Sequence, residues 1–323
     1  MATKFLITID TEGDDIWTRS PKVTTRNALF LGRFQDLCET YGFKPTYLVN
    51  YEMAIDQNFV EFAKSTLSRN KAEIGTHVHS WNSPPLSELD DWNHHSYIFE
   101  YPDELIHAKL AYLTDLLTET FGERPESHRA GRWGFDQRVA EALIKLGYRT
   151  DCSVTPGVSW KKHLGSPNGQ GGPDFFGYKL HPYYIDSANS TSPKCQLLEV
   201  PVTIKPNYKP GLEKLHNSIE QNLSGKILRK VAGPSHSWLR PTGTNTDEMI
   251  GLVGWAKGKG LPALEFMLHS SELMPGGSPK FRTSEDIDHL YKSLNTLFRT
   301  VAEAGCEGMT LREFRASWST DGC

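Results

Sequence analysis

Three short apolar runs of this chain each end in side chains that bind metal ions or transfer protons. The run Phe5–Ile9 is followed by four carboxylates within six residues, the run that begins at Glu73 leads into two histidines, and the run Leu264–Leu268 ends in one. β-Branched and aromatic residues favour strands, and in α/β folds the loops that leave the carboxyl ends of strands carry the chemistry. The pattern therefore predicts strands whose carboxyl ends meet at one site.

Strand-like and helix-like patterns alternate along the chain. Strand-like segments cover residues 45–50, 127–134 with its following loop, 148–154 and 197–204, and helical periodicity covers about 27–41, 58–68, 102–120, 137–146, 247–257 and 284–304. Residues 211–231 are ambiguous. Repeated β–α units predict a mostly parallel sheet, as a barrel or a doubly wound fold. We favour the barrel, because the chemically active segments all fall at carboxyl ends of strands.

The alternation breaks down between residues 155 and about 197, where Gly, Pro, Asn and Ser dominate. A loop of this length in a compact domain covers a functional site, is mobile, or is plain surface structure. No repeat, charge block or linker divides the chain, and 323 residues with 38% hydrophobic content suffice for one large core. We expect a single catalytic domain over residues 1–323 with a loop-rich insertion at about 155–197.

Composition narrows the partners and the compartment. The formal net charge of −4 gives no global attraction to nucleic acid, and no run reaches the roughly 18 to 20 apolar residues that cross a bilayer. No secretory signal is visible, so we expect a cytoplasmic protein without membrane insertion. The odd number of scattered cysteines favours a reducing compartment, with Cys152 packed as an apolar side chain rather than acting as a nucleophile. The cysteines are Cys38, Cys152, Cys195, Cys306 and Cys323.

The histidine pair and the acidic segment suggest a hydrolytic metal site. His77 and His79 point to the same side of an extended strand, because side chains repeat every two residues. Two imidazoles and a carboxylate form a ligand set for Zn²⁺ or a similar ion with one position open for water. Ordinary structural roles remain as alternatives: a solvated acidic turn, surface or hydrogen-bonded histidines, and a core histidine at His269.

Five motifs occur in an order that resembles a known family. They are Thr8-Ile-Asp-Thr-Glu, Gly75-Thr-His-Val-His-Ser-Trp, His128-Arg-Ala-Gly-Arg-Trp-Gly, Asp151-Cys-Ser-Val and Phe266-Met-Leu-His-Ser-Ser-Glu. Together they span nearly the whole chain and resemble the polysaccharide deacetylase superfamily, also called the NodB-homology or carbohydrate esterase 4 fold. The resemblance is greater to the branch associated with lipopolysaccharide and surface-polysaccharide biosynthesis.

The resemblance implies a distorted (β/α) barrel of about seven parallel strands that uses a divalent metal to remove N-acetyl or related N-acyl groups from sugars. The expected ion is Zn²⁺, with Co²⁺, Ni²⁺ or Mn²⁺ as alternatives. Asp10 would be the general base, and Glu12 and His77 would be metal ligands. The family's usual second histidine is replaced here by Trp81. Our preferred interpretation is that His79 supplies the missing ligand.

Two alternatives to a ligand role for His79 follow from the same comparison. In the first alternative, His79 lies behind His77 or against the substrate, and Asp14 or water completes the coordination of the metal. Otherwise the chain has lost its metal.

The remaining catalytic roles also come from the resemblance. His269 would be the general acid, with its imidazolium form held by a neighbouring carboxylate. Arg129 would orient the base, unless it forms an ordinary surface ion pair, and Asp151 would hold Arg129 in turn. The backbone N–H of Arg132 would stabilise the oxyanion.

Aromatic side chains near these motifs suit a sugar substrate. Trp81, Trp133 and Trp160 offer flat faces for sugar rings, or else pack in the core and loops. The side chain of Arg132 suits a phosphate or carboxylate on the substrate. We expect an N-acetylated sugar, nucleotide sugar or glycan as substrate, and make no prediction of oligomeric state. A non-sugar amidohydrolase and a degenerate, metal-free glycan-binding module are the alternative functions.

Overall fold

The computed structural model describes residues 3–18, 22–91, 95–166, 169–186, 196–207 and 236–318. The strands are β1 (Lys4–Thr11), β2 (Pro45–Val49), β3 (Glu73–Val78), β4 (Ser127–Ala130), β5 (Thr150–Asp151), β6 (Tyr183–Ile185), β7 (Leu197–Glu199), β8 (Ile204–Pro206), β9 (His236–Trp238), β10 (Ala263–His269) and β11 (Glu307–Met309). Among the described residues, nine strands form one curled sheet in the order β10-β1-β2-β3-β4-β5-β7-β6, with β11 also paired to β1. The strands β8 and β9 form a separate ribbon.

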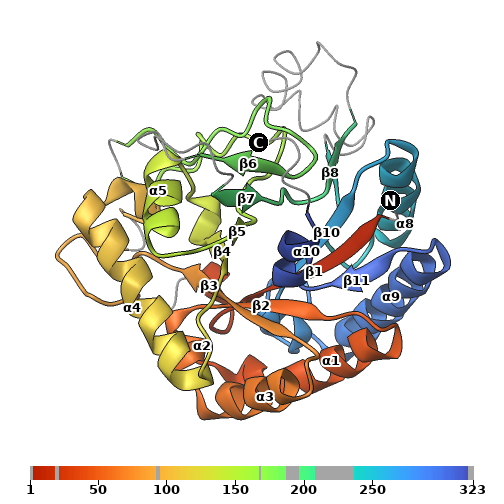
Figure 1. The fold of residues 1–323 in the computed structure, drawn as a ribbon. Coiled ribbons are helices and arrows are strands. Elements are labelled where there is room, and N and C mark those ends of the chain that lie inside the picture. The colour runs from red at the N-terminus through yellow and green to blue at the C-terminus, as the bar shows by residue number, and fades with distance from the viewer. Residues whose placement is uncertain are drawn as a thin grey trace, which may run out of the picture.

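Most of the helices cover the outer face of the curled sheet, and the last one packs against the interior at one end of the barrel (Figure 1). The helices are α1 (Leu31–Thr40), α2 (Tyr51–Ala54), α3 (Gln57–Ser68), α4 (Asp103–Phe121), α5 (Gln137–Lys145), α8 (Thr246–Gly258), α9 (Ser284–Glu303) and α10 (Leu311–Ser317). Short polar side chains define where several of them begin, because each accepts a hydrogen bond from an otherwise unpaired backbone N–H of the first turn. Asp56, Asp136 and Thr283 cap α3, α5 and α9 in this way.

Seven neighbouring strands, from β10 through β1 to β7, are parallel. This confirms the predicted distorted (β/α) barrel of about seven parallel strands. β6 adds an antiparallel edge. The open side between β7 and β10 is bridged by two backbone hydrogen bonds, from Thr203 N to Glu265 O (3.2 Å) and from Met267 N to Leu239 O (3.3 Å). The barrel is therefore closed by irregular chain on this side rather than by a strand ladder.

Side chains of β1 point alternately out of the barrel and into it. Along the inward face, an apolar residue is followed by polar ones. Phe5, Ile7 and Ile9 belong to the main core, which includes residues of α1 and α9. Leu6 lies inside the barrel and packs with residues of β2, β7, β10 and α10 and with Cys152, which follows β5. The next side chains on that face, at positions 8 and 10, are a threonine and an aspartate. On this face of β1 the polar residues thus lie toward the carboxyl end of the strand, as the sequence predicts.

Other expected segments differ in extent from the elements observed. The expected strand 148–154 is regular only at Thr150–Asp151, and the expected strand 197–204 is divided into β7 and the start of β8. Pro201 lies between these two strands and cannot donate a ladder hydrogen bond. The helix expected at 27–41 begins as a 3₁₀ turn, Arg26–Phe30. The ambiguous segment 211–231 lies outside the described residues.

The buried cysteines support a packing role. Cys38, Cys152 and Cys306 are free and buried, and burial raises the pKa of the Cys152 thiol well above its ordinary value. A thiolate nucleophile is therefore disfavoured at Cys152. Cys195 and Cys323 lie outside the described residues.

In the part of the chain that the structure describes, none of the helices is both long and apolar enough to span a bilayer.

A buried lysine anchors the loop that follows β3. Lys109 of α4 is fully buried, and its Nζ donates to the carbonyl oxygens of Ser83 (2.7 Å) and Pro85 (2.9 Å). The Asp90 carboxylate lies 2.9 Å from the same ammonium group. A buried charge needs such partners, because desolvation without them is costly. This loop begins at the carboxyl end of β3 and carries Trp81.

We expect Lys109→Met to lower the free energy of unfolding by about 3 to 5 kcal/mol, because the change leaves Asp90 and two carbonyl groups without their cation. Urea unfolding monitored by circular dichroism measures the effect. Lys64→Met, at an exposed position of α3, is the control and should change stability by no more than about 0.5 kcal/mol. Equal stability of the two variants would contradict the anchoring role.

Candidate active site

The three predicted metal ligands converge at the carboxyl end of the barrel. Glu12 follows β1, His77 is in β3, and His79 is the first residue after β3. The two Nε2 atoms of the histidines are 3.1 Å apart, and Glu12 Oε2 lies 3.4 Å from His77 Nε2 and 3.1 Å from His79 Nε2. A tetrahedral Zn²⁺ with ligands at about 2.0 to 2.1 Å separates its ligand atoms by about 3.3 Å. The observed triangle therefore has the size of one face of such a tetrahedron.

The donor groups also have the charge pattern that attracts a cation. Both carboxylate oxygens of Glu12 are buried without a hydrogen-bond partner. Burial alone would raise the pKa of Glu12, but His269, His77 and His79 together hold it below its ordinary value. Burial alone would lower the pKa of His77, but Asp10 and Glu12 raise it above its ordinary value, and a bound metal ion would replace the proton that they favour. His77 Nδ1 donates to the carbonyl oxygen of Arg129 (3.0 Å), so the lone pair of Nε2 faces Glu12. These residues fit a divalent cation.

The His79 ring is held on its face and at its edge. Trp81 stacks on it with centroids 4.4 Å apart and an interplanar angle of 22°. A Cβ atom at Gly131 would come within 2.5 Å of His79 Cδ2, so only glycine fits beside the ring. The side-chain amide of Asn50 lies 3.4 Å from His79 Nδ1. Trp81 thus packs against the histidine that we expect to be a metal ligand.

Asp14 does not complete the ligand set, which corrects one of our alternatives. Its carboxylate accepts hydrogen bonds from Thr24 Oγ1, from the backbone N–H groups of Arg26 and Asn27, and from the Asn27 amide. Hydrogen bonds that order residues 24–27 therefore occupy both oxygens of the Asp14 carboxylate.

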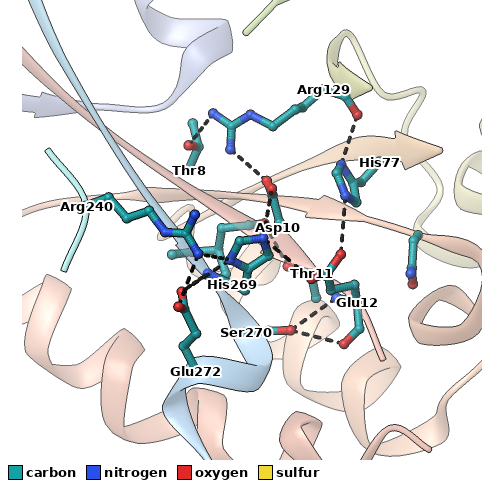
Figure 2. Close-up of polar contacts among 12 residues, drawn as sticks. Thr8, Asp10, Thr11, Glu12, His77, Arg129, Arg240, His269, Ser270 and Glu272 are labelled. Carbon is teal, nitrogen blue, oxygen red and sulfur yellow. Dashed lines mark hydrogen bonds and ion pairs between the residues drawn. The ribbon is translucent and has the colours of Figure 1, made fainter. Parts of the chain in front are cut away.

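The predicted base and acid lie beside the ligand triangle (Figure 2). The register places Asp10 opposite His269 on β1 and β10. His269 Nε2 lies 3.8 Å from Asp10 Oδ2 and 3.6 Å from Glu12 Oε1. Burial opposes ionisation of Asp10, but Arg129, His77 and His269 lower its pKa below the ordinary value. Asp10 is therefore an ionised carboxylate at neutral pH, as a general base must be.

The other nitrogen of His269 faces an ion pair between the half-buried Arg240 and the buried Glu272. His269 Nδ1 lies 3.2 Å from Glu272 Oε2 and 3.0 Å from Arg240 Nη2, and Arg240 Nη2 is 3.2 Å from Glu272 Oε1. Arg240 and its neighbours lower the pKa of the buried Glu272 carboxyl to about 2. Glu272 is thus a carboxylate beside His269 Nδ1, where the resemblance led us to expect one.

Arg129 joins four segments of the barrel from a fully buried position. Its guanidinium donates to Asp10 Oδ1 (2.6 Å), Thr8 Oγ1 (2.7 Å), the carbonyl oxygen of Cys152 (3.0 Å) and the Glu265 carboxylate. It is not an exposed ion pair, and its contact with Asp10 agrees with the orienting role expected from the resemblance.

Asp151 does not hold Arg129, contrary to our expectation, because Glu265 of β10 occupies that place. The Asp151 carboxylate accepts instead from the backbone N–H and the hydroxyl of Ser153. Burial raises its pKa to about 6, and burial together with Asp151 raises the pKa of Glu199 well above its ordinary value. The buried pair of Asp151 and Glu199 therefore retains a proton, and its effect on Arg129 is electrostatic at most.

Arg132 and Trp133 have left-handed backbone conformations, with φ values of 53° and 62°. Each such residue costs about 1 to 3 kcal/mol, and this kind of strain persists where surrounding contacts over-determine the conformation. The Arg132 guanidinium lies 4.6 Å from the Tyr97 ring centroid and donates to Ser96 Oγ. The strain therefore places an arginine and a tryptophan together at the wall of the site.

Three tryptophans form one aromatic cluster beside Arg132. Trp133 and Trp160 stack with centroids 6.3 Å apart, and Trp238 lies 6.3 to 6.4 Å from both. Trp160 comes from the loop-rich insertion, so the described part of the insertion does contribute to the site. Trp133 and Trp160 line a pocket of about 320 Å³, and Trp238 packs behind them. The pocket is formed by Asp10, Glu12, Ile16, Trp17, His77, His79, Trp81, Tyr97, Ala130, Arg132, Trp133, Trp160, His163, Arg240 and His269.

Several of these residues were not predicted from the sequence. Glu265 and His269 are separated by four positions on one strand, so the two-residue period places them on the same face. Glu272 follows His269 at the spacing of a capping box, which the structure contains. The positions of Glu265 and Glu272 relative to His269 could therefore have been inferred from the sequence. Trp17, Trp238 and Arg240 carry no comparable pattern.

No protein family and no curated protein matches the chain in sequence. Its fold is similar to that of an inferred polysaccharide deacetylase from Mycobacterium smegmatis, with a TM-score of 0.51, 14% identity, and 98% of this chain and 91% of the other covered. It is also similar to an inferred glycoside hydrolase/deacetylase from Parabacteroides distasonis, with a TM-score of 0.63, 10% identity, and 98% of this chain and 71% of the other covered. A 4-alpha-glucanotransferase from Thermococcus litoralis is similar with a TM-score of 0.55, 12% identity, and 99% of this chain and 41% of the other covered. At these identities the likeness shows a shared fold, and fold does not fix the reaction.

We expect His79→Ala to weaken Zn²⁺ binding by more than about 100-fold, because loss of a direct ligand exceeds the 10- to 100-fold effect of a supporting residue. Competition with a chelating dye measures the affinity. Glu12→Ala and His77→Ala should have similar effects. His107→Ala, at an exposed position of α4, is the control. If His79→Ala bound Zn²⁺ as well as this control, His79 would not be a ligand.

Proposed function

We propose that this protein is a metal-dependent hydrolase that removes an N-acetyl or related N-acyl group from a sugar precursor or glycan. The observation that carries the proposal is the buried triangle of Glu12, His77 and His79, flanked by Asp10 and His269 in one pocket. A metal ligand set, an ionised carboxylate and an imidazole are the groups that hydrolysis of an unactivated amide requires.

A divalent ion held by Glu12, His77 and His79 would acidify water and polarise the acyl carbonyl. Asp10, fixed by Arg129, accepts a proton as water attacks the carbonyl carbon. The amide nitrogen is a poor leaving group until it is protonated, and His269 Nε2 donates that proton. Glu272 and Arg240 contact the opposite nitrogen of the ring and so fix its orientation.

The Arg132 N–H completes the proposed arrangement as the oxyanion donor. A backbone N–H aimed at a developing negative charge contributes about 3 to 4 kcal/mol to the lowering of such barriers. The left-handed backbone at Arg132 supports this role, because strain of this kind clusters at functional sites.

The sugar substrate is supported by the aromatic walls of the pocket, since flat rings suit sugar faces. Zn²⁺ is the preferred ion because the ligands are imidazole and carboxylate, which Co²⁺, Ni²⁺ and Mn²⁺ also accept. A role in surface-polysaccharide biosynthesis rests on the sequence resemblance alone, and a cytoplasmic location rests on the scattered cysteines, which favour a reducing compartment.

The proposal is tested by metal analysis and by acetate release. Protein purified without chelators should contain about one divalent ion per chain, and acetate should appear from an acetylated sugar, nucleotide sugar or oligosaccharide. Acetate from small non-sugar amides alone would identify a different amidohydrolase. Absence of both metal and hydrolysis, with glycan binding retained, would identify a binding module instead.

We expect Asp10→Asn to retain the metal but to lose about 100-fold or more in kcat, because it removes the base and keeps the side-chain shape. The two measurements are metal content and acetate release under saturating substrate. Asp36→Asn, at an exposed position of α1, is the matched control. Near-normal turnover of Asp10→Asn would show that another group is the base.

A further inference from the structure

The pocket has a second polar corner whose side chains have no role in the hydrolytic reaction proposed above. Arg132 and His163 both line the pocket, at its wall of tryptophans and Tyr97. Glu100, an acid close to this wall, is not among the lining residues, and its carboxylate accepts from the backbone N–H groups of Tyr97 and Ser166. The lining side chains at this corner are therefore aromatic or basic, whereas the lining acids, Asp10 and Glu12, belong to the hydrolytic site.

Arg132 is held in place before any substrate binds. Its guanidinium is fixed by the Tyr97 ring and Ser96, both nearly inaccessible to solvent. The preceding residue, Gly131, packs against His79. Arg132 is therefore held one residue away from a contact with a proposed metal ligand. An arginine with fixed geometry loses less entropy on binding, and its planar fork matches carboxylate and phosphate oxygens.

The insertion segment that carries His163 is also fixed. The Tyr97 hydroxyl donates to the His163 carbonyl oxygen (2.7 Å), and Gly172 N donates to the carbonyl oxygens of Trp160 and His163 (both 3.1 Å). A Cβ atom at Gly172 would lie 2.6 Å from both Trp160 Cβ and the Tyr97 hydroxyl. The approach of the insertion to Tyr97 therefore requires glycine. Burial, Arg132 and Lys162 lower the pKa of His163, which agrees with a positive potential at this corner.

We propose that Arg132, with His163, binds an anionic group of the substrate, so that the substrate is an acylated amino sugar carrying a phosphoryl or carboxylate group. This inference rests on the proposed function and narrows its substrate class. The pocket of about 320 Å³ is at the lower end for ligand sites. A group held at Arg132 therefore belongs to the same small unit, or to its immediate linkage, as the acyl group that reaches Glu12 and His77. The tryptophan cluster supplies the face against which the sugar ring packs.

The test compares neutral and anionic substrates on the metal-loaded enzyme. The substrates are the methyl glycosides of N-acetylglucosamine and N-acetylgalactosamine, the corresponding 1-phosphates and nucleoside diphosphate sugars, and the corresponding uronic acids. We expect at least one anionic class to exceed its neutral counterpart by about tenfold or more in kcat/KM. A preference for phosphates or for uronic acids identifies the source of the negative charge.

Variants of Arg132 test whether the preference for anionic substrates arises at the second polar corner of the pocket. In Arg132→Gln the ratio of anionic to neutral kcat/KM should fall to about one, and Arg132→Lys should keep part of it, because a point charge lacks the planar fork. Arg299→Gln, at an exposed position of α9, should leave the ratio unchanged. Equal use of neutral and anionic sugars, or a preference that survives in Arg132→Gln, would overturn the inference while leaving the proposed function intact.

Direct binding separates this inference from the hydrolase proposal. Isothermal titration with the two sugar 1-phosphates and the corresponding uronic acids needs no turnover. If no acetylated sugar is hydrolysed but one of these anionic sugars binds the native protein about tenfold more tightly than it binds Arg132→Gln, the function fails and the anion site stands. Equal binding of the two proteins to the sugar 1-phosphates and to the corresponding uronic acids would remove the anion site.

Discussion

The buried guanidinium of Arg129 is the interaction on which the geometry of the site depends. It lies on β4 and donates to side chains of β1 and β10 and to a carbonyl after β5, so it joins segments distant in sequence. A buried charge with incomplete partners is costly, and removal of one partner of a buried pair typically costs about 3 to 5 kcal/mol. The same residue accepts a hydrogen bond from His77 Nδ1 through its carbonyl oxygen. Arg129 therefore fixes the carboxylate of Asp10 with its side chain and the tautomer of His77 with its backbone.

This arrangement follows from the polarity of the barrel interior. Leu6 belongs to an apolar cluster closed by α10, whereas Thr8 and Asp10 on the same face of β1 meet Arg129. A buried arginine is tolerated there because donors and acceptors from several strands reach it together. Glu265 adds a second carboxylate on the same cation. The partners balance the charge, and Asp10 remains ionised in a place that would otherwise favour its protonated form.

The sequence predicted the fold class and most long elements because β1, β2, β3, β10, α3, α4 and α9 have clear periodicity within each segment. It also placed Asp10, Glu12, His77, His79 and His269 at neighbouring carboxyl ends. Short elements such as β6, β9 and β11 escaped prediction, because three residues define no period. The partner of Arg129 was misassigned for a different reason. Asp151 and Glu265 are both acids on barrel strands, and only the three-dimensional register decides which one faces the guanidinium.

The substrate wall is the part of the site that pattern reasoning reaches least, and its construction explains why. Hydrolytic residues lie on or next to regular strands, so their directions follow from alternation. Arg132 and Trp133 depend instead on two consecutive left-handed residues, and Trp160 depends on an insertion held by Tyr97 and a glycine contact. Such contacts cannot be inferred from a sequence pattern, because irregular segments have no period. A barrel that keeps the amide chemistry on strands and the recognition of the rest of the substrate on loops can change its substrate without disturbing Arg129 and Asp10. Substrate recognition is therefore where we expect this protein to differ most from others of its fold.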